Sequence, residues 1–437
     1  MSVSKTPVGG LRLAVSAAAL MAVATPSLAE SFFLKEQSVR GAGRAYSGET
    51  ADTGVSSLWW NPASIARSGR EVYVGLHGLL LDSGVDNAGS TITYPGGTTV
   101  PVTGPLGTGH EGDPIESGLV PNFAVAMPVG DRFALGLSVA APYNFTTKYE
   151  PGSFTRYDAL TSELRSANVG LTAAYRVNDW LDVGAGVDVQ YVEAFLSSSL
   201  PNLSPLLPDG RSTLEGDGID YGWNVGAQVH TGAWDFGLSY RSEIEHELDG
   251  QIGISGLLGP IAGGNVASDG TATFTTPWFA SASVRYAVNE RLTLNGQVNR
   301  AGWSKFDAIR VRYGTTGNEI RQDYKDVTGG SLGVDYVAND RVTFRGGVAY
   351  DPTPTRDTER TARIPDGDRW LYSAGTSIKA TDTITVDAAL TYISLKDADI
   401  SSDRTLYAGT AAATTSSLRG RADGEGIAAS LGARWAF

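Results

Sequence analysis

The sequence predicts an all-β fold, a 14-stranded antiparallel transmembrane β-barrel plugged by a small N-terminal segment. Three observations predict it: segments in which apolar and polar residues alternate, connections that alternate between short turns and long loops, and no later apolar run long enough for a membrane-spanning helix. The composition agrees, with 54 Gly, 18 Tyr and 9 Trp among 437 residues. Such a glycine- and aromatic-rich composition favours strands over helices.

The first 29 residues are predicted to be a secretory signal peptide. Lys5 and Arg12 precede an apolar run at 13–24, and a small-residue cleavage site follows at 27–29. A membrane anchor is the alternative, but the run is shorter than the roughly 20 apolar residues that a spanning helix needs. Export also agrees with the absence of cysteine.

Connections of two kinds alternate along the rest of the chain. Hairpin-sized polar turns are predicted at 129–132, 177–180, 230–234, 288–291, 338–341 and 380–383. Long polar loops are predicted at 83–115, 143–161, 196–216, 249–269, 314–326, 352–367 and 397–423. With a first strand at 70–82 and a last at about 424–437, the hairpins make fourteen strands, an even number as closure requires. A soluble sandwich or propeller has no reason to sort its loops this way.

The predicted strands carry their charges on one face only. Between 180 and 195, Leu181 and Tyr191 share the apolar parity, whereas Asp182 and Asp188 share the other. A charge turned to lipid at mid-membrane costs about 2–4 kcal/mol. The charged parity is therefore expected to line the lumen and the apolar parity to face lipid.

The chain stops on an aromatic strand that ends at Phe437. Hydrocarbon offers no partners for edge amides, so this strand is expected to pair with the first. Its form resembles the signal read by the machinery that inserts outer-membrane proteins. We therefore expect a monomer in the outer membrane of a Gram-negative bacterium, with that machinery and the bilayer as partners.

Residues 30–69 lie between the signal peptide and the barrel at 70–437, and they are predicted to form a plug, or hatch. They lack alternation but carry Phe32, Phe33 and other aromatic residues that a disordered tail rarely contains. A fourteen-stranded barrel is also wide enough to need a plug.

Several motifs, in order, resemble the FadL-type long-chain fatty acid transporters. "GAGRAYSGE" (41–49) and "WWNPASIA" (59–66) are similar to the hatch of that family, in which an Asn-Pro-Ala motif closes the plug. The likeness continues through "APYNFTTKY", the segment 156–191, "GLSYRSEIEHELDG" and "RIPDGDRWLYSAGTSI". The resemblance implies passive uptake of hydrophobic molecules from outside and their sideways release through a gap in the wall.

The resemblance also implies where the site lies. Phe32 and Phe33 would approach the ligand, although packing within the plug would equally explain them. Asn61, Pro62 and Ala63 would gate the hatch, the alternative being an ordinary Asn-Pro turn. The gap would arise from a kink in the third strand, at about 131–142, which Gly136 would permit.

Two long loops are unusually rich in leucine. The residues concerned are Leu200, Leu203, Leu206, Leu207, Leu257 and Leu258. Exposed apolar patches commonly mark binding surfaces, and the resemblance implies that these loops capture the substrate. The alternative is that they pack against each other.

Long-chain fatty acids are the favoured substrates, with aromatic or other hydrocarbons as the alternative and a hydrophilic porin less favoured. A carboxylate head would need a lumen cation, for which Arg156, Arg165 and Arg345 are candidates. Hydrophobic small molecules and detergent-like amphiphiles are thus the expected ligands. With four His, no Cys and no G-x-S-x-G elbow, we expect no enzyme, metal or cofactor, and the net charge of −13 argues against nucleic acid.

Overall fold

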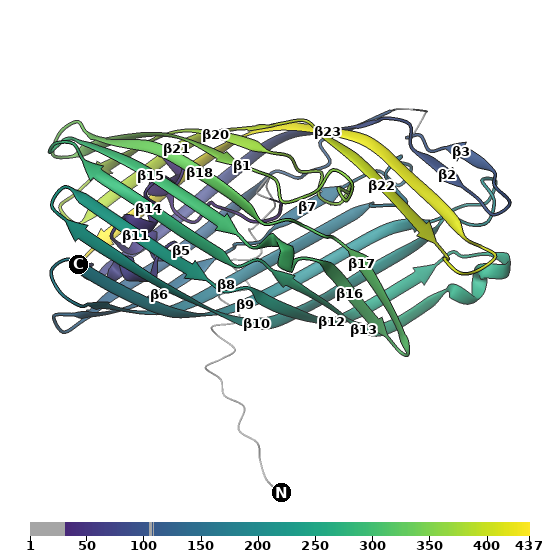
Figure 1. Ribbon diagram of the computed structural model, residues 1–437, viewed down its shortest axis with the longest axis horizontal. Helices are drawn as coiled ribbons and strands as arrows, with labels where there is room; N and C mark the ends of the chain where they lie inside the picture. The colour runs from purple at the N-terminus through teal and green to yellow at the C-terminus, as the bar shows by residue number, and fades with distance from the viewer. Residues whose placement is uncertain (1–30, 105–106, 108) are drawn as a thin grey trace, which may run out of the picture.

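The computed structural model describes residues 31–104, 107 and 109–437, which form a closed 14-stranded antiparallel β-barrel (Figure 1). The predicted fold class is confirmed. Closure is made by β1 (Glu71–Asn87) and β23 (Thr414–Ala436), which pair antiparallel from Glu71 opposite Ala436 to Asn87 opposite Gly420. The predicted signal peptide lies outside the described residues.

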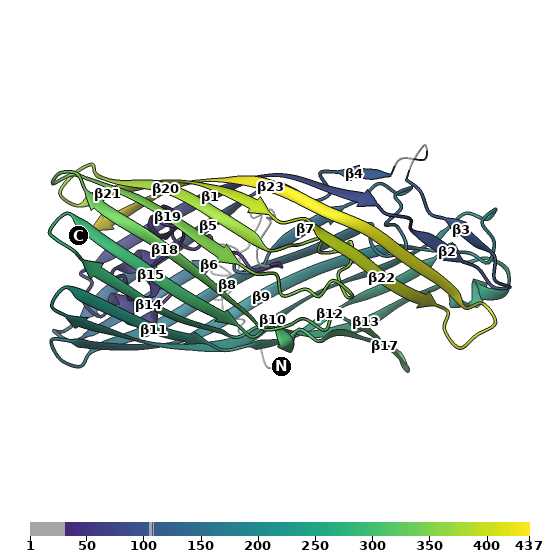
Figure 2. The ribbon, with the colours of Figure 1, turned by 45° about the horizontal axis from the view of Figure 1, so that its top comes forward.

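Eight wall strands are single elements and six are made of two pieces in line. Besides β1 and β23, the single strands are β5 (Gly118–Val129), β8 (Thr161–Arg176), β9 (Leu181–Leu200), β10 (Gly210–Thr231), β19 (Val342–Asp351) and β20 (Arg369–Lys379). The paired pieces are β6 (Phe133–Ala140) with β7 (Phe145–Lys148), β11 (Trp234–Arg241) with β12 (Ile244–Ser255), β13 (Val266–Thr276) with β14 (Phe279–Ala287), β15 (Leu292–Ala301) with β16 (Ala308–Tyr313), β17 (Thr316–Arg321) with β18 (Val327–Val337), and β21 (Ile384–Leu395) with β22 (Ala398–Leu406). Three short strands, β2 (Thr91–Thr93), β3 (Thr99–Pro101) and β4 (His110–Gly112), lie in the connection after β1 (Figure 2).

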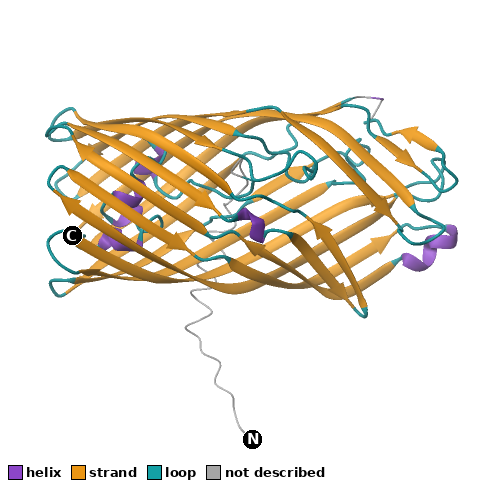
Figure 3. Ribbon diagram, viewed as in Figure 1, coloured by secondary structure: helices purple, strands orange, loops and turns teal. Residues whose placement is uncertain are grey.

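The six predicted short turns are confirmed, and all lie at one end of the barrel, the short-turn end (left in Figure 3). Six predicted loop boundaries are wrong, namely 83–115, 143–161, 196–216, 249–269, 314–326 and 397–423, because strands run into or through each segment. These stretches extend toward the opposite, long-loop end, where neither face needs to contact lipid and alternation is lost. Backbone ladder bonds form there without it.

The predicted inversion of the barrel faces is confirmed. On β9, Val187 is 55% exposed whereas its neighbour Asp188 is 1% exposed. The outward parity carries large apolar side chains around the wall, among them Leu80, Ile219, Leu238, Leu332, Phe344, Leu390 and Leu431. Trp180, Trp234 and Trp435 are exposed near the short-turn end, where an interfacial aromatic girdle belongs.

The segment before β1 folds inside the barrel as short helical turns (Figure 3). These are α2 (Val39–Ala42), η1 (Glu49–Ala51), η2 (Val55–Ser57) and η3 (Pro62–Ile65), and two further turns, η5 (Gly259–Gly264) and η6 (Trp303–Lys305), belong to connections between strands. Every residue in 31–52 is buried. Across 31–104, 107 and 109–437, no helix has the length and apolar character needed to cross a bilayer.

Candidate ligand pocket, hatch and wall opening

The third wall strand is broken between Ala140 and Phe145. On one side of the break, the ladder between β5 and β6 runs from Phe123 to Val129. Beyond the break the wall closes again, because the Lys148 amide donates to the Pro114 carbonyl at 2.7 Å. The wall therefore has a bounded interruption, which we call the wall opening.

Gly136 does not cause this break, contrary to the prediction. It is regularly paired with Ala126 on β5 and Thr172 on β8. A Cβ atom at this position would lie 2.7 Å from Ile65 Cδ1 and 2.9 Å from Leu58 Cδ2. Glycine leaves room here for the hatch side chains that pack against the wall, and the kink itself lies at Ala141–Asn144.

The hatch N-terminus pairs with the kinked segment. The Leu34 amide donates to the Pro142 carbonyl at 2.8 Å, and the Asn144 amide donates to the Phe32 carbonyl at 3.2 Å. Phe33 and Tyr143 face each other across this antiparallel bridge. Backbone groups released by the break thus find partners on the hatch, as buried amides and carbonyls require.

Phe32 forms one wall of a mainly apolar cavity, the first cavity. Its ring contacts Trp303 and Phe306, with centroid separations of 4.8 and 5.2 Å. Other apolar lining residues are Phe145, Leu164, Ala194, Leu196, Leu214, Leu248, Ala272, Phe274, Ile309 and Ile364. The lining is mainly apolar, as in a small-molecule pocket, and its polar members are Glu163, Glu215, Gln322 and Arg363.

Phe33 faces a different space. Its ring lies 4.2 Å from that of Phe279 and 5.8 Å from that of Trp59. These three side chains line a second cavity. The two phenylalanines that the sequence predicts together at the ligand are therefore divided between two cavities.

The three predicted lumen cations do not reach the first cavity. Arg156 pairs with Asp209 at 3.1 Å in the connections at the long-loop end. Arg165 pairs with Glu163 and shares the outward parity of exposed Leu171 on β8. Arg345 pairs with Asp335 at 2.8 Å.

Arg363, which sequence reasoning missed, lines the first cavity instead. Among the described residues of its lining it is the one cation, and it donates to the Ser162 hydroxyl at 3.1 Å without forming an ion pair with any described residue. Burial lowers the pKa of Arg363 to about 10, so the guanidinium stays charged at neutral pH. It lies in the connection between β19 and β20, and no alternation pattern signals that this connection folds inward.

The Asn-Pro-Ala motif is both a local cap and a contact with the wall. Asn61 caps η3 by accepting from the Ala63 amide at 2.9 Å, and its amide donates to the Ala227 carbonyl of β10 at 3.2 Å. Glycines make room for this approach, since a Cβ at Gly226 would lie 2.1 Å from Asn61 Oδ1. The motif is thus an N-cap turn that also fastens the hatch to the barrel.

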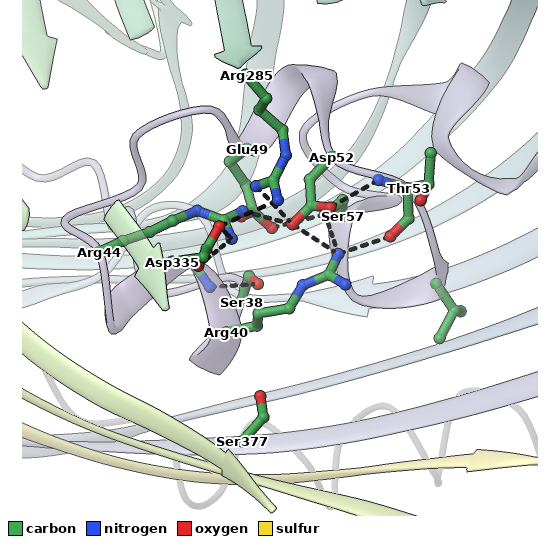
Figure 4. Close-up of polar contacts among 12 residues, drawn as sticks. Ser38, Arg40, Arg44, Glu49, Asp52, Thr53, Ser57, Arg285, Asp335 and Ser377 are labelled. Carbon is green, nitrogen blue, oxygen red and sulfur yellow. Dashed lines mark hydrogen bonds and ion pairs between the residues drawn. The ribbon is translucent and has the colours of Figure 1, made fainter. Parts of the chain in front are cut away.

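A buried ionic network, also missed from the sequence, joins the hatch to the wall (Figure 4). Arg44 is fully buried and contacts Glu49 and Asp52 of the hatch at 2.5 Å each, and Asp335 of β18 at 3.4 Å. Arg285 of β14 bridges the same two aspartates, at 3.3 Å to Asp52 and 3.0 Å to Asp335. Breaking such a network is costly because it leaves a buried charge uncompensated.

The predicted leucine-rich surface is divided. Leu200 and Leu257 are buried in a small cluster with Leu406 of β22. Leu206, Leu207 and Leu258 are 92%, 43% and 41% exposed, and Leu203 is half-buried. Packing between loops therefore explains two of the six residues, and the exposed ones remain available for contact with a ligand.

The chain is similar in sequence to a known protein family and to several of its members. The model of the family described as outer membrane protein transport protein (OMPP1/FadL/TodX) matches residues 20–437. The long-chain fatty acid transport protein of Escherichia coli K12 is 27% identical over 420 residues, covering 86% of this chain and 90% of the relative. Outer membrane protein P1 of Haemophilus influenzae is 25% identical over 410 residues, covering 86% and 88%.

Solved structures share the architecture. A FadL homologue from Pseudomonas aeruginosa has a TM-score of 0.82 at 25% identity and covers 93% of this chain and 100% of its own. The toluene transporter TbuX of Ralstonia pickettii has a TM-score of 0.63 at 19% identity, covering 92% and 99%. The latter likeness supports the fold alone.

Proposed function

Because the chain belongs to the OMPP1/FadL/TodX family of outer-membrane transport proteins, we propose that it takes up long-chain fatty acids across the outer membrane by passive diffusion. The observation that carries this proposal is the first cavity, a mainly apolar pocket lined by Glu163, Glu215 and one described cation, Arg363, which forms no ion pair with a described residue. An acyl chain fits the apolar wall and a carboxylate head fits Arg363.

The proposed route begins at the long-loop end. The exposed Leu206, Leu207 and Leu258 offer an apolar surface to an arriving acyl chain. From there the substrate moves to the first cavity, and each step is driven by removal of apolar surface from water, at about 25 cal/mol per Å². No energy source is needed when the gradient points inward.

Release is proposed to be sideways, through the wall opening. The opening adjoins the first cavity because Phe145, the first residue after the break, lines that cavity. The hatch N-terminus is bonded across the kinked segment, so exit requires Phe32–Leu34 to part from Pro142–Asn144. Asn61, Pro62 and Ala63 are proposed to keep the rest of the hatch fastened during this movement.

Aromatic hydrocarbons are the second candidate substrates, because two toluene transporters share the fold. A neutral hydrocarbon would offer the Arg363 guanidinium no hydrogen-bond acceptor inside the cavity, whereas a carboxylate would. This cation therefore supports an acid over a hydrocarbon. A hydrophilic porin would need neither the apolar cavity nor the buried hatch.

The family is one of transporters, and we propose that this member has no catalytic activity. It is further proposed to act as a monomer and to be inserted through its terminal strand, whose apolar parity runs through exposed Trp435 to Phe437. The bilayer then contacts the exposed apolar parity around the wall.

Uptake by whole cells tests the proposal. Cells that carry or lack the protein are given labelled oleate or labelled toluene at matched concentrations. We expect the protein to accelerate oleate uptake and to change toluene uptake little. Equal oleate uptake with and without the protein would contradict the proposed function, and acceleration of toluene alone would replace the acid by the hydrocarbon.

A further inference from the structure

The second cavity lies between the hatch and the wall, apart from the first. Trp59, Trp60 and Pro62 line it from the hatch, and β10, β11, β14 and β15 line it from the barrel. No described residue lines both cavities. On β10, Asn224 lines the second and Leu214 the first, about 30 Å apart along the strand at roughly 3.3 Å per residue. The second cavity is thus nearer the short-turn end.

Its lining combines an aromatic wall with hydrogen-bond donors that lack acceptors. Phe33, Tyr240 and Phe279 supply aromatic surface together with the two tryptophans. The indole Nε1 atoms of Trp59 and Trp60 are buried and have no hydrogen-bond partner among the described residues. A buried donor without an acceptor costs about 1–3 kcal/mol, so a molecule that brings acceptors into this space is stabilised.

The charges of the second cavity have one sign. Within the described chain, the charged residues that line it are Lys35 and Arg241, and no carboxylate does. Arg241 pairs with Asp188 and lies over the Trp59 ring, 4.7 Å from its centroid. Lys35 pairs with Asp351. Both carboxylates lie outside the lining, so the charged groups that an occupant of the cavity contacts are cations.

Aromatic side chains of the hatch and the kinked segment link the linings of the two cavities. The Tyr143 ring lies 5.9 Å from that of Phe32, in the first cavity, and 5.8 Å from that of Phe33, in the second. The same segment, Phe32–Leu34, must move for release by the proposed route. Its displacement would join the two spaces.

We propose that the second cavity is a further binding site for the transported molecule, taking an amphiphile with an anionic, carboxylate-type head. The head accepts hydrogen bonds from the indoles of Trp59 and Trp60 beside Arg241 and Lys35, and the apolar body lies against Phe33 and Phe279. The inference rests on the proposed function, because it concerns the same substrate after it leaves the first cavity.

Photolabelling of the purified full-length protein tests it. The probe is a long-chain fatty acid bearing a diazirine on its alkyl chain, and the labelled peptides are identified by mass spectrometry. We expect label in both cavities, on peptides holding Phe145 or Leu164 and on peptides holding Trp59 or Phe279. Label confined to the first cavity would overturn the inference and leave the proposed function standing. No label in either cavity, with no uptake in cells, would overturn both.

Two filled-cavity variants sharpen the assignment. Ser281→Phe places a ring in the second cavity, and Ala272→Phe, the matched control, places one in the first. Ser281→Phe should remove label from the Trp59 peptide while label near Leu164 persists, and Ala272→Phe should do the reverse at Leu164. Label on the Trp59 peptide that survives Ser281→Phe would overturn the assignment.

The head-group chemistry has its own test. The double change Trp59→Phe and Trp60→Phe keeps aromatic rings but removes both N–H donors. Labelling at the second cavity by the acid probe should weaken about tenfold, which corresponds to about 1.4 kcal/mol for two hydrogen bonds. A matched hydrocarbon probe without a carboxylate should label wild type and variant alike. An equal response of both probes would overturn the head-group assignment.

Discussion

At the scale of the residue, Arg363 decides which substrate the first cavity favours. Arg363→Gln keeps a hydrogen-bond donor but removes the charge. A charge-assisted hydrogen bond contributes about 1.5–3 kcal/mol, so the concentration of oleate that gives half-maximal uptake should rise roughly 10- to 100-fold. Toluene uptake should not change. The measurement is concentration-dependent uptake of both labelled compounds in the same cells.

Arg156→Gln is the matched control for this prediction. It also removes an arginine near the long-loop end, but one whose side chain is already paired with Asp209 and contacts the Tyr157 ring. Oleate uptake should stay within about twofold of wild type. An equal loss in both variants would assign the effect to the net charge of the loops rather than to Arg363.

The same residues show how far a sequence can locate a site. Arg165 was predicted as a candidate lumen cation, although parity alone would have excluded it, because it shares the outward face of β8 with Leu171. Phe32 could be assigned to the first cavity only through family resemblance. Arg363 gave no signal, since its position depends on how the connection between β19 and β20 folds into the lumen.

At the scale of the element, the bridge between the hatch and the kinked segment can be locked. Phe33 and Tyr143 form a non-hydrogen-bonded antiparallel pair, in which Cα atoms lie about 4.5 Å apart, within the range that a disulfide spans. The wild-type chain contains no cysteine, so two introduced cysteines could pair only with each other. Phe33→Cys with Tyr143→Cys should therefore oxidise to a disulfide and stop uptake, which a reductant restores.

Each single cysteine variant is the control for the loss of an aromatic ring. Either one should retain uptake that does not respond to reductant. Uptake by the oxidised double variant at the rate of the single variants would show that the hatch N-terminus need not leave the kinked segment. The proposed route of release would then be wrong.

The strands themselves were the most predictable elements. Alternation and short turns fixed the strand number and the lipid-facing parity, because the hydrocarbon layer imposes both. They did not fix strand ends, as β9 and β10 continue from 196 to Leu200 and from Gly210 to 216 without that constraint. The kink in the third strand was predicted at Gly136 but lies at Ala141–Asn144. The glycine at position 136 instead leaves room for Leu58 and Ile65 of the hatch.

At the scale of the whole molecule, the hatch closes the lumen of the barrel, and buried ion pairs fasten the hatch to the wall. Two of the contacts that join them are the Asn61 amide on β10 and the ionic network that connects Arg44 to β14 and β18. Neither contributes to closure of the wall, which β1 and β23 complete through their own ladder. The hatch and the wall should therefore respond separately to substitution.

Arg44→Met tests this separation. It removes the centre of the network and leaves Glu49 and Asp52 buried with fewer cations, at a cost of about 3–5 kcal/mol that falls on the hatch. Ionic conductance through single proteins in planar bilayers should rise, while the temperature at which the barrel unfolds in detergent changes little. Arg310→Gln, which breaks a half-exposed pair with Asp307, should alter neither. A variant that unfolds at a much lower temperature would instead make the network part of the barrel's own stability.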